Sequence, residues 1–131
     1  MIEQISTTDA PGAVGPYSQA IKAGDLLFVS GQLPIDPATG EFNSAKAVEQ
    51  AEQCLRNLQA IARAAGTELS KTIKTTVLLT DLGDFAGVNR VYASFFSTPF
   101  PARACYEVRG LPKGAKVEIE AVISLFDRPR Q

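Results

Sequence analysis

The sequence predicts an α+β domain with two layers, in which one mixed β-sheet is packed on one face by two helices. Two stretches of the chain repeat apolar residues at alternating spacings of three and four, the pattern of an amphipathic helix. The other ordered stretches alternate apolar and polar residues, or flank a tight turn, as strands do. Helices with one apolar stripe need a sheet face to cover, so a two-layer arrangement follows. The 131 residues suit a single domain, residues 1–131.

The expected order of elements is strand, hairpin, helix, strand, helix, strand, strand. In sequence, these are strands at 1–6, 17–23 and 26–32, a helix at 44–65, a strand at 71–80, a helix after Asp81 or Asp84, and strands at 100–108 and 115–126. Asn43 or Ser44 can cap the first helix, and Gly66 fits its end. Pro99 and Pro101 end the second helix and make a stiff, extended entry into the next strand.

The first hairpin has the clearest register. Gly24-Asp25 between two strands suits a type II′ turn. That turn sets the pairs Ile21 with Phe28, Gln19 with Ser30, and Tyr17 with Gln32. Gly31 stands inside a strand, which indicates that another group approaches the backbone closely there.

The strand at 100–108 carries the residues with the most chemistry. Alternation places Arg103, Cys105 and Glu107 on one face, so a guanidinium, a thiol and a carboxylate lie side by side. That face is either a solvated outer surface or the floor of a site. The last strand turns Glu118 and Glu120 away from the core, onto the same face of the sheet.

These last two strands are expected to form an antiparallel hairpin closed around Leu111-Pro112. One register pairs Cys105 with Glu118, Arg103 with Glu120, and Glu107 with Lys116. A slip by two residues keeps the same face and changes the pairs. The face also carries Tyr17, Ser30 and several apolar residues. A monomer would leave this mixed face in water, whereas an oligomer that buries it would enclose polar pockets between subunits.

The composition narrows the classes of function. The net charge is −1, the pI is about 5.4 and no basic patch occurs, which argues against nucleic-acid binding. No apolar run is long enough to span a bilayer, and the first residues lack the regions of a signal peptide. The chain has no histidine, the commonest general base and metal ligand. Two distant cysteines without metal spacing, Cys54 and Cys105, fit a reduced cytoplasmic protein.

Each candidate residue also has a purely structural interpretation. Arg103 is either a cross-strand partner of a carboxylate or a fork that binds a carboxylate or phosphate ligand. Cys105 can be a small buried apolar residue, because no histidine is present to make it a thiolate nucleophile. Tyr17 can serve packing, and Ser30 lacks a base, so it is a hydrogen-bonding group. Glu118 is either a solvated carboxylate or, if it is buried at an interface, a tuned acid or base.

A set of motifs spread over nearly the whole chain carries a family resemblance. The motifs are Ala10-Pro11, Gly15-Pro16-Tyr17-Ser18-Gln19-Ala20, Phe28-Val29-Ser30-Gly31-Gln32, Lys74-Thr75-Thr76-Val77, Asp81-Leu82, Asp84-Phe85, Val88-Asn89, Phe100-Pro101-Ala102-Arg103, Cys105, Leu111-Pro112 and Val117-Glu118-Ile119-Glu120-Ala121. Together they are highly specific, whereas any one alone is weak. On these motifs the sequence resembles the Rid family, the reactive intermediate deaminases, also called YjgF-like proteins.

The resemblance implies a fold like that of chorismate-mutase-type domains, and a homotrimer with three pockets in the clefts between subunits. It implies a deaminase that hydrolyses short-lived enamines and imines to 2-keto acids and ammonia. The substrates would be 2-aminoacrylate, its tautomer 2-iminopropanoate, and 2-iminobutanoate, which pyridoxal-phosphate enzymes release. The resemblance implies neither a metal nor an organic cofactor.

The resemblance also implies roles for individual residues. Arg103 would bind the substrate carboxylate, and the backbone N–H groups of Gly31 and Cys105 would complete that anion site. Glu118 and the Cys105 thiol would position water. The rest of the pocket would be formed by Tyr17, Ser30 and, in a supporting role, Asn89.

Three features depart from the family pattern. The segment Ser97-Thr98-Pro99 is short, Tyr106 stands where a small aliphatic residue is common, and residues 127–131 run past the usual end. These differences bear on substrate range more than on reaction type.

Two other functions stay open from the sequence. A trimer that captures small carboxylates without turnover would use the same arginine. A ribonuclease or translation inhibitor, a label that some relatives carry, is disfavoured by the acidic pI and by the absence of histidine and of a basic patch.

Overall fold

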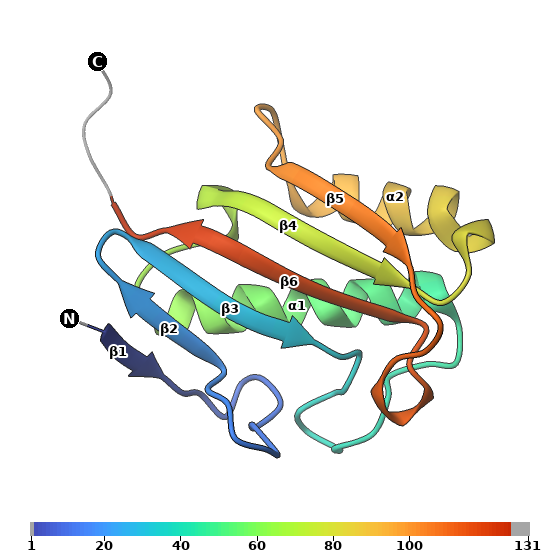
Figure 1. The fold of residues 1–131 in the computed structure, drawn as a ribbon, viewed down its shortest axis with the longest axis horizontal. Helices are drawn as coiled ribbons and strands as arrows, with labels where there is room; N and C mark the ends of the chain where they lie inside the picture. Colours follow the sequence, from blue (N-terminus) through green and yellow to red (C-terminus); the bar gives the residue numbers. More distant parts are fainter. Residues whose placement is uncertain (1, 127–131) are drawn as a thin grey trace.

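A computed structural model describes residues 2–126 of the chain. It contains one six-stranded sheet and two α-helices, both of which lie behind the sheet in Figure 1. The elements are β1 (Ile2–Ile5), β2 (Ala20–Ala23), β3 (Leu26–Gln32), α1 (Ala47–Ala64), β4 (Thr72–Leu79), α2 (Phe85–Phe95), β5 (Ala102–Glu107) and β6 (Val117–Ser124). Short 3₁₀ turns precede β4, α2 and β6. The fold class and element order are as the sequence predicts, and residues 127–131 lie outside the described part.

The strands are arranged in the order β1-β2-β3-β6-β4-β5. β4 pairs with β5 in parallel and with β6 in antiparallel, so β4 lies between the two last strands (Figure 1). The predicted β5–β6 hairpin is therefore wrong. The reason is the segment β4-α2-β5, a strand–helix–strand unit, which brings its two strands side by side in parallel while the helix crosses one face.

The residue pairs predicted for that hairpin are therefore wrong as well. Across β4, Arg103 lies beside Thr75 and Cys105 beside Val77 on the β5 side. On the β6 side, Leu78 pairs with Glu118 and Thr76 with Glu120. The carboxylate of Glu107 does not face Lys116. Its Oε1 instead accepts a hydrogen bond from the backbone N–H of Leu82, 2.8 Å away, at the turn that leads into α2.

The core lies between the sheet and the two helices. α1 supplies the fully buried Leu55, Leu58 and Ile61, which pack with Ile119 and Ile123 of β6 and with other apolar residues of the sheet. The predicted apolar stripe of this helix thus covers the sheet. α2 contacts α1 on the same face of the sheet, as expected for a two-layer domain.

The helix ends differ in part from the prediction. α1 begins at Ala47 after Lys46, which makes no side-chain cap, so neither Asn43 nor Ser44 is its N-cap. The hydroxyl of Ser44 is held by the Glu49 carboxylate and accepts from the N–H of Lys46, which places it just before the helix. Gly66 follows the helix with a φ of 83°, as expected of a glycine at that position.

The β2–β3 hairpin has the predicted register, with Ile21 opposite Phe28. Gly24 takes the positive φ, 61°, that the turn requires. The backbone N–H of Ser30 donates to the carbonyl of Gln19, 2.9 Å away, which extends the pairing by one step. The ladder does not reach Tyr17, because the chain bends before β2 begins.

The side chain of Gln19 fixes the loop that precedes the hairpin. It is 4% exposed. Its Nε2 donates to the carbonyls of Thr7, Ala10 and Pro11 at 3.0, 3.3 and 2.7 Å, and its Oε1 accepts from the N–H of Thr7 at 2.7 Å. One buried amide therefore satisfies four backbone groups of residues 7–11. Because buried backbone groups need partners, this side chain decides the path of the loop.

Replacing Gln19 by Leu is expected to lower the free energy of unfolding by about 1–3 kcal/mol, because the loop's backbone groups lose their partner. It should also speed proteolytic cleavage within residues 7–16. Urea denaturation and timed limited proteolysis measure both effects. Gln4→Leu makes the same chemical change at an exposed position of β1 and serves as the control. Equal behaviour of the two variants would contradict the role assigned to Gln19.

Candidate functional site

One set of predicted site residues lines a cleft of about 470 Å³ at the end of β3. Its walls come from the N-terminal loop, β3, β6 and the turn before β6. The lining includes Pro11, Gly12, Val14, Tyr17, Ser30, Gly31, Pro112, Lys113, Glu118 and Glu120. Tyr17, the adjacent pair Ser30-Gly31 and the distant Glu118 thus meet in one place.

A β-bulge in β3 shapes this cleft. Val29 pairs with Ala121 and Gln32 with Ile119, so Ser30 and Gly31 together oppose the single residue Glu120. Gly31 leaves the space that the neighbouring carboxylate occupies. A Cβ atom at residue 31 would lie 2.5 Å from Oε2 and 2.9 Å from Cδ of Glu118. The close approach that the sequence predicted at Gly31 is confirmed, and the approaching group is the Glu118 side chain.

The environment of Glu118 favours its neutral form. Burial raises the pKa of this carboxyl above the usual value, and the nearby charge of Glu120 raises it further. A carboxylate in this state accepts a proton more readily than an ordinary glutamate, as a general base near neutral pH must. The hydroxyl of Ser30 donates to the carbonyl of Ser18 at 2.6 Å, so its oxygen lone pairs remain available to a ligand.

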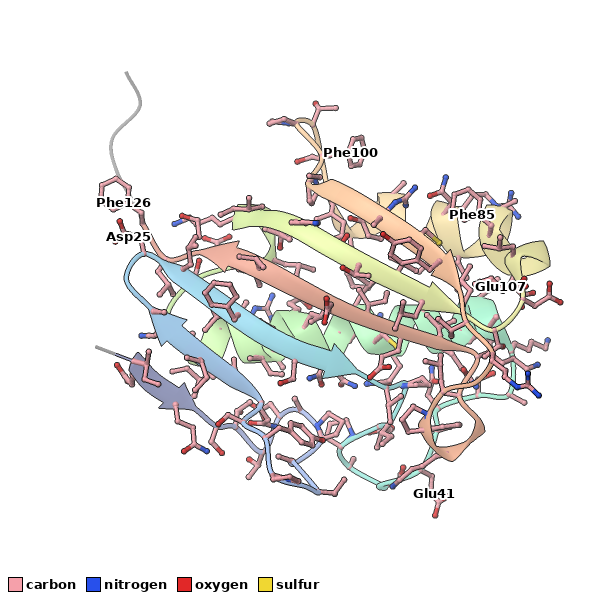
Figure 2. The ribbon with its side chains drawn as sticks, in the orientation of Figure 1. Asp25, Glu41, Phe85, Phe100, Glu107 and Phe126 are labelled. Carbon is pink, nitrogen blue, oxygen red and sulfur yellow. The ribbon has the colours of Figure 1, made fainter. Side chains whose placement is uncertain are left out.

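The second set of predicted site residues surrounds Arg103 at the far edge of the sheet. A cleft of about 500 Å³ there is lined by Asn89, Tyr92, Ala93, Phe100, Pro101 and Arg103. Nη1 of Arg103 donates to Oδ1 of Asn89 at 2.6 Å. Figure 2 shows Phe100 where the chain enters β5, and Phe85 on the first turn of α2. The guanidinium therefore lies between the edge strand and α2.

Cys105 shares the helix-facing side of β5 with Arg103 and packs against the core. Burial raises the pKa of its thiol above the ordinary value, although the positive charge of Arg103 acts in the opposite direction. The thiol is thus protonated at neutral pH and is suited to hydrogen bonding rather than to nucleophilic attack. Cys54 is a core residue: it is fully buried and its Sγ lies 3.6 Å from the carbonyl oxygen of Val117.

Within one chain the two sets lie on opposite faces of the sheet. Arg103 contacts α2 and Cys105 the core, whereas Glu118 alternates with the buried Val117 and Ile119 and so points away from the helices. The predicted common face for Arg103, Cys105 and Glu118 is therefore wrong. The parallel β4–β5 pairing is the cause, because it aligns Arg103 and Cys105 with residues of β4 that face the helices.

Sequence reasoning missed two aromatic partners of the arginine. The Cζ atom of Arg103 lies 4.8 Å from the ring centroid of Tyr92 and 5.5 Å from that of Phe85. Both rings lie on the apolar stripe that the sequence predicts for this helix, yet Phe85 is 36% exposed. The available signal was the spacing of Phe85, Asn89 and Tyr92, which places all three on one helix face.

Two structural features are absent from residues 2–126. No group of three or more histidine, cysteine, aspartate or glutamate side chains in this range is placed to hold a metal ion. No helix in the same range has the length and apolar character needed to cross a bilayer.

Comparison with known proteins assigns the family. A family model described as endoribonuclease L-PSP matches residues 7–125. The chain belongs to this family, that of the YjgF and Rid proteins. RutC family protein y4sK of Sinorhizobium fredii is 89% identical over 125 residues, which cover 95% of this chain and 99% of that protein. The resemblance derived from the motifs is confirmed.

Other family members carry more specific names. The 2-iminobutanoate/2-iminopropanoate deaminase of Homo sapiens is 49% identical over 118 residues, covering 90% of this chain and 86% of that protein. The crystal structure of RidA from an Antarctic Psychrobacter bacterium superposes with a TM-score of 0.90 at 48% identity, covering 93% of this chain and 98% of the other. The fold of one mixed sheet and two helices is therefore that of RidA.

The raised pKa of Glu118 gives a stability prediction. Because the folded state favours the protonated carboxyl, wild type loses stability as the pH rises through the folded-state pKa of Glu118. Glu118→Gln, similar in size and uncharged, should be more stable than wild type at pH 7.5. The difference should shrink as the pH falls toward about 4.3, the pKa of a free glutamate. Urea denaturation across this range measures it, with Glu3→Gln on exposed β1 as control. If the difference in free energy of unfolding between the two proteins does not change with pH, the pKa of Glu118 is not raised by folding.

Proposed function

We propose that this protein is an imine/enamine deaminase that converts 2-aminoacrylate, 2-iminopropanoate and 2-iminobutanoate to 2-keto acids and ammonia. The observation that carries the proposal is that Arg103 has no carboxylate partner among residues 2–126. Among residues 2–126 the one ion pair within 4.0 Å joins Arg56 and Glu52, so no carboxylate of this range neutralises Arg103. A free guanidinium binds a small carboxylate with paired, charge-assisted hydrogen bonds. Relatives named as deaminases of these imines support the reaction.

The working site is proposed to form between subunits of a homotrimer. Arg103 and Glu118 lie on opposite sides of the sheet in one chain, so a pocket that contains both needs a second copy. The face of the sheet turned away from the helices also exposes apolar side chains that a partner would cover, including Phe28 at 46% and Tyr106 at 58% exposed. In this arrangement the Tyr17–Ser30–Gly31–Glu118 cleft of one subunit meets the Asn89–Arg103 cleft of its neighbour, with the neighbour's Cys105 on the same strand as Arg103.

The chemistry asked of these residues is modest. Arg103 and nearby backbone N–H groups hold the substrate carboxylate, and the imine carbon is already electrophilic. Glu118 takes a proton from water as the water oxygen bonds to the carbon of the protonated imine, which gives a carbinolamine. Glu118 then gives this proton to the nitrogen, the C–N bond breaks as the carbinolamine hydroxyl loses its proton to Glu118, and ammonia and the 2-keto acid leave. The neutral Cys105 thiol orients the water by hydrogen bonding.

We also propose where the substrates come from and where in the cell the protein acts on them. The substrates are products of pyridoxal-phosphate enzymes acting on small hydroxy- and thiol-bearing amino acids, and the place of action is the cytoplasm. Water and acid–base groups suffice, so the proposed reaction uses no metal and no organic cofactor.

The family description also contains the word endoribonuclease. Ribonuclease function has little physical support in this chain, because 13 basic and 14 acidic residues give a net charge of −1 and no histidine is present. RNA binding relies on cationic surfaces that neutralise phosphates.

The proposed reaction is tested by coupling the protein to a serine or threonine dehydratase and following the release of 2-keto acid. Wild type should accelerate release. Arg103→Ala should lower kcat/KM roughly ten- to hundredfold, the value of a charge-assisted hydrogen bond to carboxylate. Arg56→Ala removes an exposed arginine on α1 and is the control.

No acceleration by wild type, or equal rates for wild type and Arg103→Ala, would refute the catalytic proposal. Binding of 2-ketobutyrate without any acceleration would instead favour a non-catalytic carboxylate-binding trimer. Cleavage of RNA that persists in Arg103→Ala after rigorous purification would favour a ribonuclease.

The proposed assembly makes a separate prediction. Sedimentation velocity at micromolar concentration should give the mass of three 14.0 kDa chains. Arg103→Ala and Glu118→Gln should each have at most about a tenth of wild-type activity alone. Co-expressed in equal amounts, they should recover about a quarter of wild-type activity, because each mixed trimer contains one site with both residues intact. A monomer, or mixed assemblies without activity, would argue against an intersubunit site.

A further inference from the structure

One face of α2 forms a platform beneath Arg103. Phe85, Asn89 and Tyr92 follow one another at spacings of four and three residues, so their side chains lie in a row along the helix. Arg103 contacts all three: its Cζ atom lies 5.5 Å from the Phe85 ring centroid and 4.8 Å from that of Tyr92, and its Nη1 donates to Asn89. We call these three residues the α2 platform.

The α2 platform holds the arginine without neutralising it. An amide and two aromatic faces attract a guanidinium, but none of them carries a negative charge. Asn89 uses one of the five N–H donors of Arg103. A carboxylate partner would fix the side chain equally well but would compete with an anionic ligand. The platform therefore combines a fixed position with an unused positive charge.

The platform itself is fixed from the core. Tyr92 is 4% exposed, and its hydroxyl lies 2.7 Å from Oγ1 of the buried Thr75. Thr75 is also the residue of β4 that lies beside Arg103 in the sheet. The ring of Tyr92 contacts the ring of Phe96 at 4.7 Å between centroids. The backbone that carries Arg103 and the ring that supports its guanidinium are thus tied to the same threonine.

We propose that Phe85 and Tyr92 are positioning residues, which set the guanidinium of Arg103 for a small carboxylate through their ring faces. This rests on the proposed function, since the carboxylate is that of the imine substrate or the keto-acid product. Beyond the proposed function, we expect the affinity for the carboxylate to depend on the aromatic rings at residues 85 and 92. An aliphatic side chain of similar volume at either position would not support the guanidinium in the same way.

The test measures two quantities, the Kd of 2-ketobutyrate by calorimetry and the kcat and KM of the coupled assay. Phe85→Leu and Tyr92→Leu remove a ring and keep apolar volume. Each should raise Kd and KM about two- to fivefold with little change in kcat, as expected for loss of a cation–π contact that acts in binding. Phe85→Tyr keeps the ring and should retain wild-type affinity. Tyr92→Phe keeps the ring but loses the hydrogen bond to Thr75, so its affinity should lie between those of wild type and Tyr92→Leu. A structural role would not separate ring-keeping from ring-removing variants in this way.

Two further variants sharpen the test. Phe95→Leu removes a ring of the same helix that lies 6.0 Å from Arg56 rather than near Arg103, and should leave Kd unchanged. Asn89→Asp keeps the shape of the platform but adds a carboxylate beside Arg103. It should weaken 2-ketobutyrate binding more than either leucine variant, because the charge is then neutralised.

The outcomes separate this proposal from the proposed function. Wild-type binding of 2-ketobutyrate that weakens in the leucine variants supports the platform even if no imine is hydrolysed. Imine hydrolysis with unchanged Kd and KM in Phe85→Leu overturns the platform and leaves the reaction standing. Failure of wild type to bind 2-ketobutyrate overturns the platform as well. If Tyr92→Leu does not fold, the exposed Phe85 position decides the result alone.

Discussion

The position of β4 is the constraint on which the rest of the structure depends. β4 is hydrogen-bonded to β5 on one side and to β6 on the other, in opposite senses. The parallel pairing requires α2 to cross back over the sheet, and this brings α2 beside the edge strand. Arg103 thereby gains the helix as its support. Glu118, one strand beyond β4, points to the opposite face.

The bulge at Ser30 and Gly31 is the second device that shapes the site. It interrupts the regular ladder, and the missing side chain of Gly31 admits the carboxylate of Glu118. A half-buried carboxyl with a raised pKa costs stability at neutral pH. This loss of stability occurs in the cleft where, in the proposed reaction, the carboxyl acts as a base. Functional sites often lower the stability of a protein in this way.

Local features of the sequence predicted most of the fold. The helix stripes, the Gly24-Asp25 hairpin and the close approach at Gly31 depend on neighbouring residues, and the structure confirms them. The partner of β5 depends on distant residues, and the short link between β5 and β6 favoured the wrong hairpin. The strand–helix–strand pattern over residues 72–107 was the signal for a parallel pair. For the candidate site, residue types and motifs pointed to side chains that line two clefts, but their division between two faces of the sheet needed the strand order.

The separation of Arg103 from Glu118 has a chemical consequence of its own. Had the two residues been neighbours on one sheet face, they would have formed an ion pair. The positive charge would then have lowered the pKa of Glu118, and the carboxylate would have occupied the guanidinium. Instead, burial and Glu120 raise the pKa of Glu118, and the neutral groups of the α2 platform leave Arg103 unpaired among residues 2–126. A carboxyl with a raised pKa and an arginine without an ion-pair partner coexist here because the topology keeps them on opposite faces of the sheet within each chain. In the proposed intersubunit site, a ligand between the two groups would contact both.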